Sequence, residues 1–308
     1  MVSTMNARDF ADTLGPMAGR TVVRRGGEVV FDGGQTRQSF DVHSVSKSFT
    51  ATALGLLIGD GACSLDDRAA ETLPFLAERY GDVTLRHLAT MTSGYNAHGA
   101  MYPPDRPTDG SRTFDVPAEP LFEPGVMWHY HDDAVRVLGL CLERIAGRTM
   151  VELLDLRVMP AVGVDGWRWT DYQHTGKGSD AGSGVWMSSR ELAAWGEFWR
   201  RGCDGLLPAG FIADATSHRT AGVPTYRGGH YRHIDVADHL GYLWREARPF
   251  PTLGDGAFYI RGWACSHLFV APALDLVVAR AGYDPDLSGD DIAGTWARAF
   301  DALLDSTA

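Results

Sequence analysis

Short runs rich in β-branched and aromatic residues lie near both ends of the chain. At residues 21–31 the sequence TVVRRGGEVVF places two such runs around Gly26 and Gly27. Paired glycines between two strand-like runs are typical of a hairpin turn, so we predict a β-hairpin here. Four further runs follow in the C-terminal third, separated by turn residues: LGYLWREA, GAFYIRGW, SHLFVAP and LDLVVARAG. The pattern predicts one sheet that is built from both ends of the chain.

Helical patterns occupy most of the chain between these two groups of strands. Residues 46–59 are mostly apolar, rich in Ala and Leu, and end in glycine, which predicts a helix. Amphipathic patterns predict further helices at VTLRHLATM, at DDAVRVLGLCLERIAG and at SSRELAAWGEFWRRG, and a last helix at about 289–305. Ser188 or Ser189 fits the N-cap of the third of these helices. Residues 97–125 are rich in proline and have little periodicity, so we predict a long loop.

The order of these elements predicts an α+β fold. An antiparallel β-sheet is flanked by terminal helices, and an all-α subdomain is inserted in the middle of the chain. We place the sheet domain in residues 1–62 and 183–308 and the helical insert in residues 63–182. A chain of 308 residues is long enough for one large domain or two moderate ones.

Composition excludes some classes of partner. The net charge is −11 (28 basic minus 39 acidic residues), and no basic run is present, so we expect no nucleic-acid partner. No apolar run approaches the roughly 18 residues of a membrane helix, so we expect no membrane partner. The N-terminus lacks the basic start and apolar stretch of a secretory signal, which predicts a cytoplasmic protein. The four cysteines lie far apart with no C-x-x-C pair, which indicates neither a disulfide framework nor a zinc site.

Lysine is rare in this chain, and one of its two lysines follows a serine by three residues. Lys47 and Lys177 are the only lysines, while arginine supplies the other basic residues. Residues i and i+3 share a helix face, so Lys47 can reach the Ser44 hydroxyl. Arg stays protonated in proteins, whereas Lys can act as a neutral base. The spacing therefore fits a serine nucleophile activated by lysine, and it equally fits a helix cap beside a surface charge.

A second candidate lies just before the predicted helix DDAVRVLGLCLERIAG. Tyr130 follows a Pro-Gly turn and could relay protons between a nucleophile and a leaving group. The alternative is a half-buried core tyrosine. Position alone does not separate the two.

Six stretches in a fixed order resemble the serine β-lactamase and penicillin-binding-protein superfamily. Within it, the chain is most similar to class C β-lactamases, family VIII-type esterases and 6-aminohexanoate-dimer hydrolases. The stretches are VVRRGGEVVFDGG, SVSKSFTATALGLLIGDGACSLDD, VTLRHLATMTSGY, PGVMWHYHDD with LGLCLERIAG, GSGVWMSSRELAAWG and YIRGWACSHLFVAPALDLVVAR. The resemblance implies that Ser44 is the acylated nucleophile, that Lys47 activates it, and that Tyr130 is the partner acid or base. It places the active site between the sheet domain and the helical subdomain.

Two family motifs are altered here. The Y-x-N motif is Tyr130-His131-Asp132, and a carboxylate at 132 would pair with Lys47, hold it charged and weaken it as a base. The K-T-G motif is best matched by Ile260-Arg261-Gly262, where only the glycine is kept. The N–H of the next residue, Trp263, would form the oxyanion hole with that of Ser44.

The missing lysine bears on the substrate. Ile260 stands where the family's lysine often meets a substrate carboxylate. By strand alternation, Arg261 should point to the opposite face from Ile260, where it is either a solvated charge or a substrate contact. This change favours the esterase and amidase branch over β-lactams.

Two other motifs are weaker. His174-Thr175-Gly176 spells a known substitute for K-T-G but lies in a glycine-rich run with no strand pattern, and Lys177 beside it reads as a loop charge. His129-x-His131-x-Asp133 begins like a metallo-hydrolase motif but has Ala134 where the last His should be. We therefore expect no metal and no cofactor.

The sequence thus predicts a serine hydrolase that forms an acyl-enzyme with a small-molecule ester or amide. The alternatives are a β-lactamase or D,D-peptidase, or an acyltransferase on the same scaffold. A further alternative is a catalytically silent binding protein, which the altered second and third motifs leave open.

Overall fold

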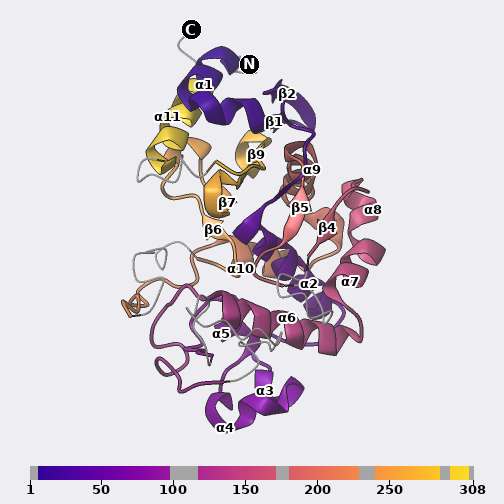
Figure 1. The fold of residues 1–308 in the computed structure, drawn as a ribbon, viewed down its shortest axis with the longest axis vertical. Helices are drawn as coiled ribbons and strands as arrows, with labels where there is room; N and C mark the ends of the chain where they lie inside the picture. The colour runs from indigo at the N-terminus through magenta and orange to yellow at the C-terminus, as the bar shows by residue number, and fades with distance from the viewer. Residues whose placement is uncertain (1–5, 98–116, 171–179, 229–239, 285–291, 305–308) are drawn as a thin grey trace.

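The computed structural model describes residues 6–97, 117–170, 180–228, 240–284 and 292–304. Its main element is a six-stranded antiparallel sheet with strand order β2-β1-β9-β8-β7-β6 (Figure 1). The strands are β1 (Thr21–Arg25), β2 (Glu28–Asp32), β6 (Arg245–Glu246), β7 (Phe258–Arg261), β8 (His267–Ala271) and β9 (Leu276–Arg280). Strand β1 pairs with β9, with Thr21 opposite Arg280. The sheet is therefore built from both ends of the chain, as predicted.

Both faces of this sheet are covered by helices. Successive strand residues point to opposite faces, so Val22 and Val277 contribute to one core and Val23 and Val278 to the other. The terminal helices α1 (Ala7–Leu14) and α11 (Ile292–Leu304) pack together on one face. Helix α9 (Ser189–Arg200) packs on the other. The fold class predicted from the sequence is thus confirmed.

Helix α9 approaches the sheet closely because it carries a glycine at the contact. A Cβ added at Gly196 would lie 2.6 Å from Val277 Cγ1, which no ordinary packing tolerates. The helix begins with a capping box, in which Ser188 accepts from the N–H of Glu191 and the Glu191 side chain accepts from the N–H of Ser188. Of the two predicted N-caps, Ser188 is the one used.

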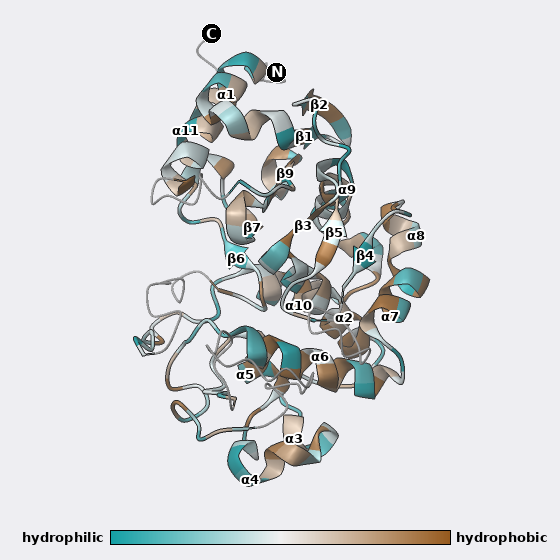
Figure 2. Ribbon diagram, in the orientation of Figure 1, coloured by the Kyte–Doolittle hydropathy of each residue, from teal (hydrophilic) through white to brown (hydrophobic). Residues whose placement is uncertain are grey.

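Helix α2 (Lys47–Gly59) lies between the sheet and the remaining helices. Eleven of its residues are buried, which its continuous apolar sequence explains. It packs against α6 and α7, and brown, hydrophobic segments gather where these helices meet (Figure 2). The other helices are α3 (Ala69–Thr72), α4 (Ala77–Tyr80), α5 (Leu85–Ala89), α6 (Asp132–Ala146), α7 (Met150–Arg157), α8 (Met159–Val162) and α10 (Ala209–Thr216).

A second, small sheet contains strands from both predicted regions, the sheet domain and the helical insert. Its strand order is β3-β5-β4, with β3 (Phe40–Asp41), β5 (Val185–Met187) and β4 (Arg168–Trp169). Strand β4 belongs to the stretch for which only helices were predicted. The division into residues 1–62 with 183–308 and an insert of 63–182 stays a prediction. The pairing of β4 with β5 and the packing of α2 against α6 and α7 both join residues from the two sides of this division.

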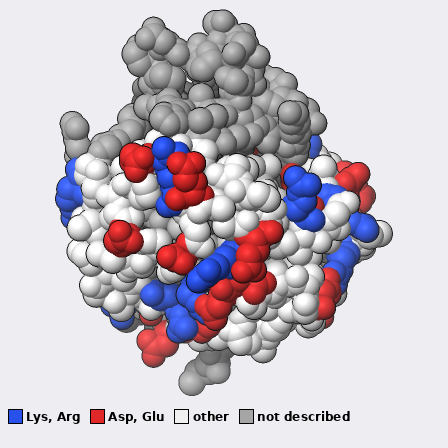
Figure 3. Space-filling model, turned by 90° about the horizontal axis from the view of Figure 1, so that it is seen from below, with Lys and Arg blue, Asp and Glu red and all other residues white. Residues whose placement is uncertain are grey.

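Two surface properties bear on the predicted partners. Among the described residues, no helix combines the length and apolarity needed to cross a bilayer. The face at the α3–α4 end of the molecule mixes acidic and basic side chains (Figure 3). Ion pairs in this region include Arg79–Glu119 and Arg86–Asp66, each at 2.9 Å. This face therefore lacks the one-sign field that attracts nucleic acid.

Candidate active site

Ser44 lies in a tight turn that leads into α2. A 3₁₀ turn spans His43–Ser46, and the first helical residue after it is Lys47. The turn is fixed by Asp41, whose Oδ1 accepts from the N–H of His43 at 2.7 Å. The N-cap of α2 is Ser46, and the Ser44 side chain bonds to other side chains instead of the helix end. The alternative that Ser44 is a helix cap therefore fails.

The hydroxyl of Ser44 meets two groups that can exchange protons. Its Oγ lies 2.6 Å from Tyr130 Oη and 2.9 Å from Lys47 Nζ. The amine also lies 5.1 Å from the centre of the Tyr130 ring. Residues 44 and 130 are far apart in sequence and come together because α2 packs against α6, just ahead of which Tyr130 stands. The structure thus brings together the three residues that the sequence singled out.

Lys47 is buried and surrounded by acceptors. It is only 2 % exposed, so the alternative of a surface charge is wrong. Its Nζ lies 2.6 Å from Asp132 Oδ1, 2.7 Å from the carbonyl oxygen of Gly182 and 2.9 Å from Ser44 Oγ. An ammonium has three N–H donors and no acceptor, and here each donor has an oxygen in reach.

The neighbouring carboxylate decides the charge of this lysine. Burial by itself would lower the pKa of Lys47, but the charge of Asp132, with a smaller contribution from Tyr130, outweighs burial and raises it. Burial would likewise raise the pKa of Asp132, but Lys47 and then Arg136 lower it. Both shifts favour the ion pair, so Lys47 is an ammonium in the resting protein.

A second buried ion-pair network fixes the loop that supplies the Gly182 carbonyl. Arg136 on α6 lies 2.6 Å from Asp133 and 2.6 Å from Asp180. The next residue of the loop, Ala181, accepts at its carbonyl from Thr50 of α2 at 2.7 Å. The loop is thus held by both helices. No local pattern in the sequence predicts this network, since Arg136 and Asp180 lie 44 positions apart.

The end of β7 lies directly against the turn that carries Ser44. A Cβ added at Gly262 would stand 2.2 Å from the carbonyl oxygen of Val42, which explains why this position of the third motif is glycine. The ring of Trp263 packs edge-on against His43, with centroids 5.6 Å apart. Trp263, whose N–H is expected to donate to an oxyanion, therefore lies beside the turn that carries Ser44.

The two altered residues of the third motif point to opposite faces, as strand alternation predicted. Ile260 is buried in the core that contains α9, whereas Arg261 is exposed. The family's lysine position is thus filled by a core residue. Residues 174–177, with the weaker H-T-G match and Lys177, lie outside the described residues.

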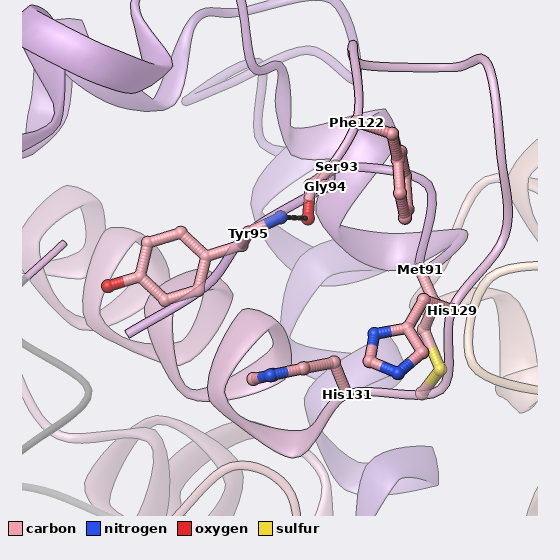
Figure 4. Close-up of a pocket in the computed structure, with 7 residues that line it drawn as sticks. All are labelled: Met91, Ser93, Gly94, Tyr95, Phe122, His129 and His131. Carbon is pink, nitrogen blue, oxygen red and sulfur yellow. Dashed lines mark hydrogen bonds between the residues drawn. The ribbon is translucent and has the colours of Figure 1, made fainter. Parts of the chain in front are cut away.

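A small hollow is lined in part by His129 and His131, the residues on either side of Tyr130 in the sequence. Figure 4 shows that it is lined by Met91, Ser93, Gly94, Tyr95, Phe122, His129 and His131. Burial, with a smaller contribution from the nearby His131, lowers the pKa of His129 to about 4. The third residue of the metal-like motif, Asp133, is engaged by Arg136. Within the described part of the chain, no group of three acidic, Cys or His side chains is placed to hold a metal ion.

Comparison with known proteins extends these findings. A family model described as Beta-lactamase matches residues 14–299. Among curated proteins, a beta-lactamase of Pseudomonas fluorescens is 28% identical over 127 residues, which is 41% of this chain and 35% of that protein. The matched segment thus spans about a third of that relative's length.

Solved structures show the same fold at low identity. A Bacillus anthracis protein assigned provisionally as a 6-aminohexanoate-dimer hydrolase has a TM-score of 0.72 at 17% identity, over 91% of this chain and 77% of its own. EstCE1, described as a hydrolase with promiscuous acyltransferase activity, has a TM-score of 0.69 at 18% identity, over 97% and 99% of the two chains. At such identities these likenesses show the fold alone. The family match over residues 14–299, together with this fold, shows that the chain belongs to the Beta-lactamase family.

Proposed function

We propose that this protein is a serine hydrolase that cleaves a small ester or amide through an acyl-enzyme on Ser44. The observation that carries the proposal is the position of Ser44 Oγ, within hydrogen-bond distance of both Tyr130 and Lys47. A nucleophile and a base in mutual reach, with the base oriented by a further group, are what nucleophilic catalysis requires. Asp132 and Gly182 orient Lys47, which in turn donates to Ser44 Oγ and lies against the Tyr130 ring.

The proton of Ser44 passes to Tyr130 in this proposal. Lys47 is held as an ammonium by Asp132 and so has no free lone pair. The Tyr130 oxygen makes the shorter contact to Ser44 Oγ, at 2.6 Å. As Ser44 Oγ bonds to the substrate carbonyl carbon, Tyr130 Oη accepts the serine proton and passes its own hydroxyl proton to the leaving oxygen or nitrogen, whose bond to that carbon breaks. Water later cleaves the acyl-enzyme by the reverse route.

The N–H groups of Ser44 and Trp263 are the proposed oxyanion hole. The contact of Gly262 with Val42 and that of Trp263 with His43 support this role, because they hold the two backbone segments together. Two converging N–H donors stabilise the negative oxygen that develops during acyl transfer.

A small ester or amide substrate remains the preferred class. Transfer of the acyl group to an amine or alcohol, or β-lactam and D,D-peptide cleavage, would use the same acyl-enzyme. The fold neighbour EstCE1 is described as a hydrolase with promiscuous acyltransferase activity. This description supports testing both water and an amine or alcohol as the acceptor of the acyl group. The predicted cytoplasmic location and absence of nucleic-acid or membrane partners stay predictions.

A fluorophosphonate probe tests the nucleophile directly. We expect intact-mass analysis to show one adduct, and peptide mapping to place it on Ser44. Ser44→Ala should abolish both the adduct and the hydrolysis of a short-chain nitrophenyl ester. Ser39→Ala, which changes an exposed serine of the preceding loop, is the matched control and should keep both. A folded parent that takes no label would instead favour the silent binding protein.

A further inference from the structure

Two large aromatic side chains are exposed beside the turn that carries Ser44. Trp263 is 60 % exposed and Tyr283 is 45 % exposed, and their ring centroids lie 5.5 Å apart in an edge-to-face arrangement. The ring of His43, the residue before Ser44, lies 5.6 Å from that of Trp263 and 6.3 Å from that of Tyr283. Single exposed apolar side chains need no explanation, but neighbouring ones mark a binding surface. We call the rings of Trp263 and Tyr283 the aromatic platform.

A buried arginine holds the two segments that carry these rings. Arg280, at the end of β9, is fully buried. Its Nη1 donates to the carbonyl oxygen of Cys265 at 2.6 Å, and its Nη2 donates to the carboxylate of Asp284. Cys265 follows Trp263 by two residues, and Asp284 directly follows Tyr283. The aromatic platform is therefore fixed before a ligand arrives, which lowers the entropy cost of binding.

The backbone directly after Trp263 has an unfavourable conformation. Ala264 has a φ of 53° and Cys265 a φ of 73°, both in the left-handed region that favours glycine. Residues keep such angles only where surrounding contacts enforce them, and these residues cluster at functional sites. The hydrogen bond from Arg280 to Cys265 is one such contact. Two strained residues after an exposed tryptophan indicate that the position of its ring has a use.

The aromatic platform lies on the sheet side of Ser44, whereas Tyr130 lies just ahead of α6 on the helical side. In the proposed mechanism, Tyr130 gives a proton to the leaving group, and the carbonyl oxygen of the substrate accepts from the N–H of Trp263. The acyl group is the remaining substituent of the carbonyl carbon. It therefore lies away from Tyr130 and within reach of the Trp263 ring.

We propose that Trp263 and Tyr283 bind an aromatic ring in the acyl group of the substrate. The inference rests on the proposed acyl-enzyme function and adds the substrate class to it, an ester or amide of an aromatic carboxylic acid. Two rings that meet edge to face offer both a face and an edge to a third ring, and aromatic pairs are stabilised beyond the area that they bury. An uncharged ring needs no cation, which agrees with Ile260 at the position of the motif lysine.

Two vinyl esters that differ only in the ring test the proposal. Vinyl phenylacetate and vinyl cyclohexylacetate share the leaving group, and titration follows the acid released from both. We expect the parent to favour the aromatic ester, and Trp263→Leu to lower the ratio of the two kcat/KM values by about 3- to 10-fold, as for an aromatic pair. Trp263→Phe should keep most of the ratio, and Tyr283→Leu should lower it as well. Any damage to the oxyanion hole cancels in this ratio, because both esters use the same N–H groups.

Phe75→Leu is the matched control. Phe75 is likewise exposed, at 40 %, but lies in the short Pro74–Leu76 helix of the other region, so its loss should leave the ratio unchanged. Equal losses on both esters in Trp263→Leu, or a parent without preference for the aromatic ester, would overturn the proposal. Benzyl acetate and cyclohexylmethyl acetate carry the ring on the leaving group instead. If Trp263→Leu changes the ratio for this pair alone, the assignment to the acyl group is wrong.

A binding measurement separates this proposal from the proposed function. Phenylacetamide and cyclohexylacetamide are titrated into Ser44→Ala protein and followed by ligand-observed NMR, which needs no turnover. We expect Trp263→Leu to weaken the binding of phenylacetamide by about threefold or more, and that of cyclohexylacetamide less. If this loss is seen but Ser44 takes no fluorophosphonate probe, the aromatic platform stands and the acyl-enzyme fails. If Ser44 is labelled but both amides bind as before, the acyl-enzyme stands and the aromatic platform fails.

Discussion

Asp132 Oδ1 lies 2.6 Å from Lys47 Nζ, so the residue that stands at the family's asparagine position forms a buried ion pair with the lysine of the nucleophile motif. The pair lies between α2 and α6, and Arg136 adds a second positive charge near Asp132. An asparagine could accept a hydrogen bond from Lys47 but could not hold it charged. In the proposed mechanism, this one difference determines which residue receives the proton of Ser44.

Asp132→Asn should therefore move the pH dependence of acylation. Removing the carboxylate removes the main effect that raises the pKa of Lys47 and leaves burial, which lowers it. Lys47 then loses its proton at lower pH. If its charge assists Tyr130, the alkaline limb of kcat/KM for a nitrophenyl ester shifts to lower pH. A gain of activity at neutral pH would instead show that neutral Lys47 is the base. Circular dichroism checks the fold, since the variant leaves a buried charge unpaired.

Lys47→Arg and Lys47→Met test the same charge in a second way. Arg keeps the charge, but its longer planar group cannot meet the three acceptors that surround Nζ. Met is neutral and of similar length. We expect both to slow single-turnover acylation, within the range of about 10²- to 10⁴-fold associated with proton-transfer catalysis, and Met to be the slower. A Met variant as fast as the Arg variant would show that the charge is not needed.

Gly262→Ala should open the proposed oxyanion hole. The added Cβ would lie 2.2 Å from the Val42 carbonyl oxygen, so β7 must move away from the Ser44 turn. Losing the alignment of one oxyanion donor typically costs about 10²- to 10³-fold in kcat. Gly210→Ala is the matched control, since a Cβ there meets nothing within 4 Å. An unchanged kcat in Gly262→Ala would remove Trp263 from the oxyanion hole.

His129→Leu should reduce the acid sensitivity of the fold. Burial lowers the pKa of His129 from its ordinary 6.5 to about 4. The unfolded chain thus binds a proton between these values while the folded chain does not, so stability is lost as pH falls through that window. One such group accounts for about 2–3 kcal/mol of unfolding free energy between pH 7 and pH 4.5. Urea unfolding at both pH values measures the free energy of unfolding. From pH 7 to pH 4.5 this free energy should fall by about 2–3 kcal/mol less in the variant than in the parent. An equal drop would place the acid-sensitive group elsewhere.

The parts of the site that the sequence predicted depend on local spacing or ordered motifs. Lys47 reaches Ser44 because three residues separate them on one turn, and the hairpin of β1 and β2 follows from Gly26-Gly27. The opposite faces of Ile260 and Arg261 follow from strand alternation alone. Each of these relations spans only a few residues.

The parts that the sequence missed depend on distant contacts. Arg136 meets Asp180 across 44 positions, and the Gly182 carbonyl meets Lys47 across 135. The run LGYLWREA predicted a strand, but only Arg245 and Glu246 are one, because Leu243 has a left-handed backbone with φ of 65° and turns the chain toward α5. No local pattern reports where a loop or turn meets another element.

The pairing of β1 with β9 has a consequence for how the protein is made. The turn that holds Ser44 is synthesised early, but the sheet beside it stays incomplete until residues 276–280 have left the ribosome. Contacts of such large sequence separation slow folding. The N–H of Asn6 also donates to the carbonyl of Leu303, so the two ends lie together. A nascent chain therefore carries its proposed nucleophile for most of translation without the fold that could use it.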